Sequence, residues 1–150
     1  MKMQDDFREL LELLNEKKAE YLVIGAFALA FYGVPRYTGD LDLLVKPSPE
    51  NAKLVLSALN EFGFSSSDLT EEDFSNPGIV IQLGYPPVRI DLITSITGVS
   101  WDEAFSNSLK GPFDDITVRF IGKKEFIKNK KAIGRLKDLA DIEAIGGDNN

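Results

Sequence analysis

The sequence predicts an α/β (α+β) protein in which helices pack on a small mixed β-sheet, with a C-terminal helical extension. Short apolar runs alternate along the chain with segments whose apolar residues recur at helical spacing. A long segment, basic at first and acidic later, follows the last apolar run. Such alternation is typical of a sheet covered by helices. The 150 residues suit a single domain spanning 1–150.

The first half of the chain is predicted to contain three helices and two strands. Apolar residues at helical spacing, or an apolar run closed by glycine and proline, predict helices at 4–18, 26–33 and 50–62. Short apolar runs that end in glycine or turn residues predict strands at 21–25 and 40–45.

The second half continues the pattern after a polar segment, 65–73, that is predicted to be a loop with at most one helical turn. Strands are expected at 79–84, 88–94 and 116–122, the first two joined by a tight connection. A short helix is expected at 100–108, because Ser100 can cap it with Glu103 three residues later. The segment 123–145 is predicted to form one or two helices.

Composition restricts the chemistry, because the chain contains no cysteine and no histidine. Disulfides, thiol nucleophiles, imidazole bases and zinc sites built on these residues are therefore excluded. Catalysis would depend on carboxylates, lysine, arginine, hydroxyl groups and the backbone. Any metal would be bound through oxygen, which favours Mg²⁺ or Mn²⁺.

Charge is distributed unevenly along the chain. The net charge of −7 argues against a protein that coats nucleic acid in general. Residues 119–137 nevertheless contain eight basic residues and one acid, which fits either a local anion-binding surface or a solvated basic helix. No apolar run approaches the roughly 18 residues needed to span a bilayer, and the start lacks a secretory signal pattern. A cytoplasmic protein is expected.

Asp40 and Asp42 are the sharpest candidates for a functional site. They lie two residues apart on a predicted strand, so both carboxylates project from the same face. Two close carboxylates repel each other, and a divalent cation with substrate phosphates would relieve that repulsion. The alternative is a polar strand face exposed to water.

Two further positions strengthen the metal interpretation. Gly25 ends a predicted strand where a helix begins, so its backbone can approach a phosphate closely, although for a glycine considered alone a tight turn is the favoured explanation. Asp91 is an acid framed by aliphatic residues on another strand. It either lies at a solvent-exposed edge or completes a three-carboxylate site.

The segment 23–45, VIGAFALAFYGVPRYTGDLDLLV, is similar to the signature of the nucleotidyltransferase (polymerase-beta-like) superfamily. That signature has an apolar strand, Gly followed by Gly or Ser, about a dozen residues, and then Asp-x-Asp or Asp-x-Glu. The portion 32–45 most resembles minimal bacterial nucleotidyltransferase-like proteins related to the AbiEii abortive-infection toxins. The C-terminal segment 129–145, NKKAIGRLKDLADIEAI, resembles a motif of the same group.

The resemblance implies a nucleotidyltransferase fold in which Asp40 and Asp42 bind Mg²⁺ or Mn²⁺ and Asp91 supplies the third carboxylate. The catalytic and metal-binding residues would then be these three acids. Asp91 would also help to activate the attacking hydroxyl.

The resemblance also implies a set of nucleotide-binding residues, which are Gly25, Ala26, Arg36, Thr38, Lys130, Arg135, Lys137 and Asp138. The basic residues near the C-terminus would neutralise the triphosphate or bind the acceptor, with Asp138 orienting them. Arg36 and Thr38 would face the same cleft. Ala26 departs from the usual Gly or Ser: its amide can still donate to phosphate, but a side-chain contact is lost.

Each basic candidate has a structural alternative. Arg135 with Asp138, and Lys137 with Asp141, form i,i+3 and i,i+4 pairs that could simply support an exposed helix. Arg36 is by default a turn arginine and becomes a phosphate ligand only if the cleft exists.

The leading hypothesis is an enzyme that transfers NMP from an NTP to the hydroxyl of an RNA or protein acceptor, with a role related to toxin–antitoxin systems. The alternative is a catalytically inactive module that binds a nucleotide or a partner protein on the same fold. A metal-dependent nuclease is disfavoured, since it would leave Gly25 without a role. No membrane partner is expected, and the sequence is compatible with a homodimer.

Overall fold

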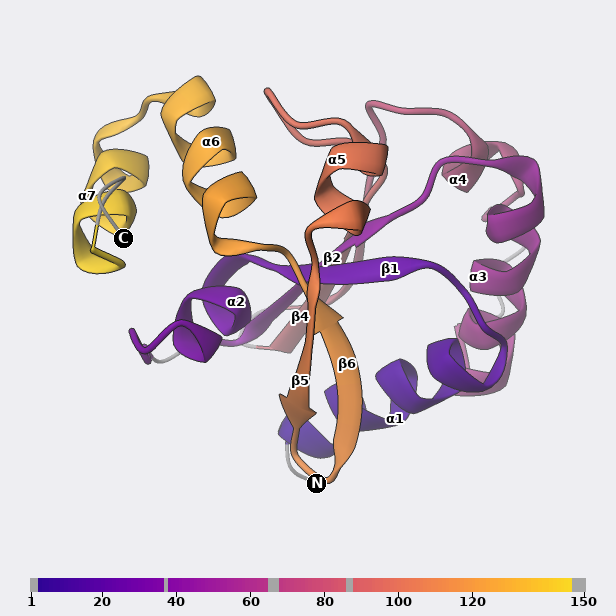
Figure 1. Cartoon of the computed structure of the whole chain (residues 1–150). Helices are drawn as coiled ribbons and strands as arrows, with labels where there is room; N and C mark the ends of the chain where they lie inside the picture. The colour runs from indigo at the N-terminus through magenta and orange to yellow at the C-terminus, as the bar shows by residue number, and fades with distance from the viewer. Residues whose placement is uncertain (1–2, 37, 65–67, 86–87, 147–150) are drawn as a thin grey trace.

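The computed structural model describes residues 3–36, 38–64, 68–85 and 88–146. At its centre is a six-stranded sheet in the order β3-β4-β2-β1-β6-β5 (Figure 1). The strands are β1 (Tyr21–Ile24), β2 (Asp40–Val45), β3 (Val80–Tyr85), β4 (Val88–Ile93), β5 (Leu109–Phe113) and β6 (Ile116–Phe120). The helices are α1 (Met3–Glu16), α2 (Gly25–Phe31), α3 (Pro49–Phe62), α4 (Glu72–Ser75), α5 (Trp101–Ser106), α6 (Lys123–Ile133) and α7 (Leu136–Ala144).

Two parallel strand pairs make the sheet mixed, which confirms the predicted fold class. β2 runs parallel to β4 and β1 runs parallel to β6. The β1–β2, β3–β4 and β5–β6 pairs are antiparallel. Because β2 and β4 are parallel neighbours, both strands begin at the same end of the sheet, and their polar residues lie close together.

The core forms between the sheet and the apolar stripe of α1, which also packs against α3. The α1 residues that recur at helical spacing are all 0–1% exposed; they are Phe7, Leu10, Leu11 and Leu14. On β2, burial alternates at the start of the strand: Leu41 and Leu43 are fully buried, whereas Asp40 and Asp42 are only partly buried. Alternation along a strand therefore directs the two acids away from the core.

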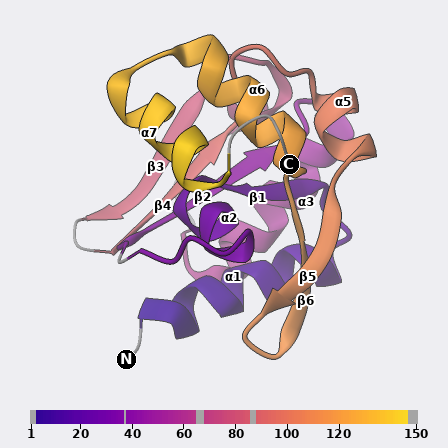
Figure 2. The same cartoon turned by 60° about the vertical axis from the view of Figure 1, so that its left-hand side comes forward.

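The C-terminal segment forms two helices. α6 ends at Gly134, whose φ of 73° is the left-handed conformation that favours glycine, and α7 begins after Arg135. Figures 1 and 2 show α6 and α7 together beside α2, which makes them the helical extension predicted from sequence. None of the helices in the described part of the chain is long and apolar enough to cross a membrane.

β5 was not anticipated, and this is the main difference from the predicted elements. Its sequence contains Gly111 and Pro112, which argue against a strand. β5 lies at the edge of the sheet and pairs only with β6, so proline at this position costs little. The helix expected at 100–108 is shorter, although Ser100 does accept a hydrogen bond from the Glu103 amide at 3.1 Å. The positions 65–67 and 86–87 lie outside the described residues.

Asn51 fastens α3 to the sheet, a role that sequence inspection did not suggest. Its side chain is buried, accepts a hydrogen bond from the Glu20 amide at 2.7 Å, and donates to the carbonyls of Glu20 at 2.9 Å and Lys46 at 3.1 Å. One side chain thus joins the start of α3 to the segments that flank β1 and β2.

Asn51→Ala should lower the free energy of unfolding by about 2–4 kcal/mol, because it leaves buried backbone groups without partners. Lys53→Ala, an exposed position on the same helix, should change it by less than about 0.5 kcal/mol. Urea denaturation of both variants measures the difference. Equal stability of the two variants would contradict the fastening role.

Candidate active site

The three predicted acids lie next to one another on the parallel β2–β4 pair. Asp42 is the register partner of Asp91, and Asp40 is the register partner of Arg89. Asp91 is 7% exposed, while the other two acids are partly buried. The strand pairing therefore assembles the acids that the sequence singled out, and adds one arginine.

Arg89 is a site residue that sequence reasoning missed. Its Nε lies 2.9 Å from Oδ1 of Asp91, and one terminal nitrogen lies 3.2 Å from Oδ2 of Asp91 and 3.4 Å from Oδ2 of Asp40. The guanidinium thus bridges two of the three acids. A signal was present in the sequence, since Arg89 precedes Asp91 by two residues and must share its face of the strand.

Arg89 contacts the carboxylates of Asp40 and Asp91, so the negative charge of Asp42 is offset less than theirs. Burial raises its pKa to about 7, and the charge of Asp91, a hydrogen bond with Asp91 and the charge of Asp40 act in the same direction. The charge of Arg89 opposes them but does not cancel them. The cluster accordingly carries more negative charge than Arg89 alone neutralises.

The Asp42 carboxylate leaves no room for a side chain at position 25, which is a glycine. The residue begins α2 with a φ of 69°, and a Cβ placed there would lie 2.2 Å from Oδ2 of Asp42. The start of α2 therefore contacts the carboxylate directly. This contact gives a physical reason for glycine at the strand–helix junction that is distinct from the close approach of a phosphate.

A cavity of about 280 Å³ opens beside the acids and contains most of the predicted site residues. It is lined by Gly25, Ala26, Leu29, Arg36, Thr38, Asp40, Asp42, Lys130, Lys137 and Asp141. Segments far apart in sequence, from the start of α2 to α7, meet around it. Three predicted residues do not line it, namely Asp91, Arg135 and Asp138.

Arg135 and Asp138 form the pair that the structural alternative anticipated. Asp138 is fully buried and accepts hydrogen bonds from Nε of Arg135 at 2.6 Å and from Nζ of Lys130 at 3.3 Å. The hydrogen bond from Arg135, followed by the hydrogen bond and the charge of Lys130, lowers the pKa of Asp138 to about 2. Asp138 therefore anchors Lys130 beside the cavity and accepts a hydrogen bond from the Arg135 amide at the start of α7, whereas the half-exposed Arg135 side chain does not line the cavity.

The structural alternative paired Asp141 with Lys137, but Asp141 contacts other basic residues. Its Oδ1 accepts a 2.7 Å hydrogen bond from Arg36, and its Oδ2 lies 3.4 Å from Nζ of Lys130. Asp141 thus ties the loop before β2 to the C-terminal helices. Lys137, which lines the cavity, has no recorded ion pair among the described residues.

The donor chemistry fits a hard cation, but the present side-chain arrangement is not a closed metal site. Among the described residues, no group of three or more acids is arranged to hold a metal ion. Asp40 and Asp42 do line the cavity with oxygen donors, and Asp42 is undercompensated in charge. Two carboxylates completed by phosphate oxygens form a suitable donor set for Mg²⁺ or Mn²⁺.

Comparisons with known proteins identify a matching family and a similar fold. Residues 3–148 match the family described as "Nucleotidyl transferase of unknown function (DUF2204)". The chain belongs to this family. A Thermotoga maritima protein (TM1012), provisionally described as a nucleotidyltransferase, has a similar crystal structure with a TM-score of 0.59 and 16% identity over 93% of this chain and 87% of that one. No curated protein sequence matches the chain.

Membership of this nucleotidyltransferase family and the shared fold confirm the coarser sequence prediction. The similarity to the Thermotoga protein concerns the fold alone. The closer relation to the AbiEii group and the roles of individual site residues stay predictions.

Asp42 makes the stability of the protein depend on pH. Because its pKa is raised to about 7 from an ordinary value of 3.8, the folded chain holds a proton that the unfolded chain releases between these values. This contribution is present below about pH 4 and is lost as the pH rises through 7, at a cost on the order of 2–4 kcal/mol. In the absence of divalent cations, the wild type should therefore unfold more readily at pH 8 than at pH 5.

Asp42→Asn should reduce this difference between pH 5 and pH 8, as measured by urea denaturation at both pH values. An unchanged difference would show that another group is responsible.

Gly25→Ala should destabilise the protein through two separate effects, left-handed backbone strain and collision with Asp42. Gly134→Ala is a matched control, since its φ of 73° is similar and its added Cβ would make only an ordinary contact at 3.5 Å. Left-handed strain costs about 1–2 kcal/mol at either position, and the collision should add a further ~1–3 kcal/mol at Gly25. In an Asp42→Ala background most of the extra cost should disappear, because only the Cβ of residue 42, at 3.1 Å, remains near the added methyl group. Thermal unfolding of the four variants measures it.

Proposed function

We propose that the chain transfers NMP from an NTP to the hydroxyl of an RNA or protein acceptor in a reaction dependent on Mg²⁺ or Mn²⁺. The observation that carries this proposal is the meeting of opposite charges around one cavity. Asp40 and Asp42 line it together with the basic residues Lys130, Lys137 and Arg36. Carboxylates for a cation and bases for phosphates are the two requirements of phosphoryl chemistry.

In this proposal Asp40 and Asp42 hold the metal, which when bound supplies charge stabilisation to the triphosphate and the leaving pyrophosphate. Lys130 and Lys137 bind phosphate oxygens, and the amide of Ala26 offers a further donor. The acceptor oxygen attacks the α-phosphorus, the bond from that phosphorus to the bridging oxygen breaks, and pyrophosphate leaves. Asp91 accepts the hydroxyl proton.

Arg89 and Asp141 are positioning residues in this mechanism. Arg89 contacts both oxygens of Asp91 and so fixes the orientation of this carboxylate, while each oxygen keeps a lone pair that can take a proton. Asp141 directs Arg36 and Lys130 towards the cavity. Metal binding through Oδ2 of Asp40 would displace the contact of that oxygen with Arg89.

The position of Arg89 favours a second candidate function, a catalytically inactive module that binds a nucleotide or a partner protein. If the guanidinium of Arg89 bridged Asp40 and Asp91 permanently, its positive charge would take the place of a metal cation at these acids. Ala26 in place of a glycine or serine agrees with this candidate.

The finer assignment to the AbiEii-related proteins, and with it a role related to toxin–antitoxin systems, rests on the motifs at 32–45 and 129–145. It directs the choice of acceptors to test. RNA 3′ ends and protein hydroxyls are the two classes proposed.

Asp40→Asn combined with Asp42→Asn should reduce Mg²⁺-dependent turnover by at least about 10³-fold, since the metal would lose both carboxylate ligands. The measurement is pyrophosphate release from each of the four NTPs, with total RNA and a cell-protein fraction as acceptors. Asp102→Asn, an exposed acid on α5, should leave turnover unchanged.

NTP binding in calorimetry without pyrophosphate release from the wild type would support the inactive module. Turnover that persists in the double variant would contradict the proposed mechanism. Absence of NTP binding to the wild type would contradict both the enzyme and a module that binds a nucleotide.

A further inference from the structure

A second cavity lies where the β5–β6 hairpin diverges from β1. β1 and β6 are in register at Val23 and Phe120, and the hairpin then runs away from β1 past α1 (Figure 1). The space between them is a cavity of about 340 Å³. Its walls come from the end of α1, the start of β1, α5 and both strands of the hairpin, and it shares no lining residue with the cavity beside Asp40 and Asp42.

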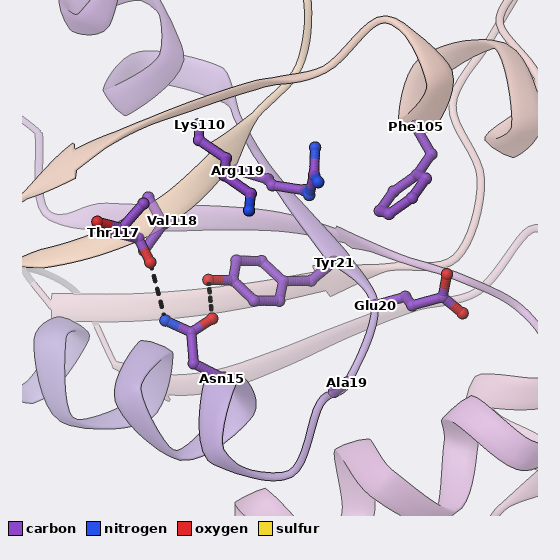
Figure 3. Close-up of a pocket in the computed structure, with 9 residues that line it drawn as sticks. All are labelled: Asn15, Ala19, Glu20, Tyr21, Phe105, Lys110, Thr117, Val118 and Arg119. Atoms are coloured by element: carbon purple, nitrogen blue, oxygen red, sulfur yellow. Dashed lines mark hydrogen bonds between the residues drawn. The ribbon is translucent and has the colours of Figure 1, made fainter.

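Two basic side chains reach into this second cavity. Lys110 and Arg119 are directly paired across the β5–β6 ladder, and Figure 3 shows both on the same side of the Tyr21 ring. Within the described part of the chain, neither has a carboxylate partner. The wall contains one acid, Glu20, whose carboxylate is already paired with Lys46 at 3.4 Å. Two positive charges are therefore available in a protein whose net charge is −7.

The side chain of Arg119 is held in place in the absence of a ligand. Its terminal nitrogen donates to Oγ of Ser108 at 3.1 Å, and its guanidinium carbon lies 5.0 Å from the centre of the Phe105 ring. A guanidinium fixed in this way loses less freedom when it binds an anion, and the planar group suits phosphate oxygens.

The floor of the cavity is aromatic and fixed. Tyr21 is 4% exposed, and its hydroxyl donates to Oδ1 of Asn15 at 2.8 Å. Asn15 in turn donates to the Thr117 carbonyl at 2.9 Å, which joins α1 to the hairpin (Figure 3). These two hydrogen bonds fix the Tyr21 ring beside the two cations.

We propose that this cavity binds a nucleoside 5′-monophosphate, with the phosphate between Lys110 and Arg119 and the base against Tyr21 and the edge of the Phe105 ring, whose faces contact Arg119 and Trp101. Two cations match the double negative charge of a phosphate monoester. The aromatic and apolar walls suit a planar base. The volume falls at the small end of ligand sites, which fits a mononucleotide better than a dinucleotide. This site is independent of the proposed catalytic function.

The test is a titration of the ¹⁵N-labelled full chain with AMP in EDTA, followed by NMR. EDTA removes the divalent cations that binding beside Asp40 and Asp42 would need. We expect saturable shifts of the amides of Lys110, Thr117 and Arg119. Lys110→Ala should weaken AMP binding by about tenfold or more, the loss expected when a charge-assisted contact is removed. Adenosine and inorganic phosphate should each bind at least about tenfold more weakly than AMP.

Lys53→Ala removes an exposed lysine from α3, outside both cavities, and should leave AMP affinity unchanged. Arg119→Gln is the second variant, but Lys110→Ala is decisive because Lys110 is exposed and its loss should not perturb folding. The proposal is overturned if AMP does not saturate, if shifts cluster at Gly25–Asp42 instead, if Lys110→Ala binds like the wild type, or if inorganic phosphate binds as tightly as AMP.

Discussion

The repulsion among Asp40, Asp42 and Asp91 is the constraint on which the rest of the site depends. Parallel pairing of β2 with β4 brings the acids together, and Arg89 on the same face neutralises part of their charge. The negative charge of Asp42 is only partly offset, and its carboxylate lies so close to the start of α2 that only glycine fits there. The strand register, the arginine and the glycine are therefore parts of one electrostatic arrangement.

Local sequence signals predicted most of the fold because burial follows them closely. The helical stripe of α1 and the alternation of acids and leucines on β2 are both found as expected. β5 could not be predicted in the same way, since its tolerance of Gly111 and Pro112 depends on its position at the sheet edge. The position of a strand within a sheet is a property of the whole fold.

Sequence reasoning anticipated which residues meet around the cavity better than it anticipated the contacts among them. Asp40, Asp42, Gly25 and the loop residues before β2 do share a cavity with α6 and α7. Sequence spacing along α7, however, suggested that Asp141 pairs with its helical neighbour, whereas its recorded partners are Arg36 and Lys130. Contacts between distant segments compete with local ones, and only three-dimensional packing decides between them.

Polar contacts help to attach the C-terminal helices, in addition to the buried Ile142 and Ile145. Leu136 and Leu139 of α7 are 86% and 48% exposed, while Asp141 connects that helix to Arg36 in the loop before β2. The Arg36 side chain is 45% exposed, and ion pairs near the surface are screened by salt. Added salt therefore weakens this connection of α7, and the ionic strength sets how firmly one wall of the cavity is held.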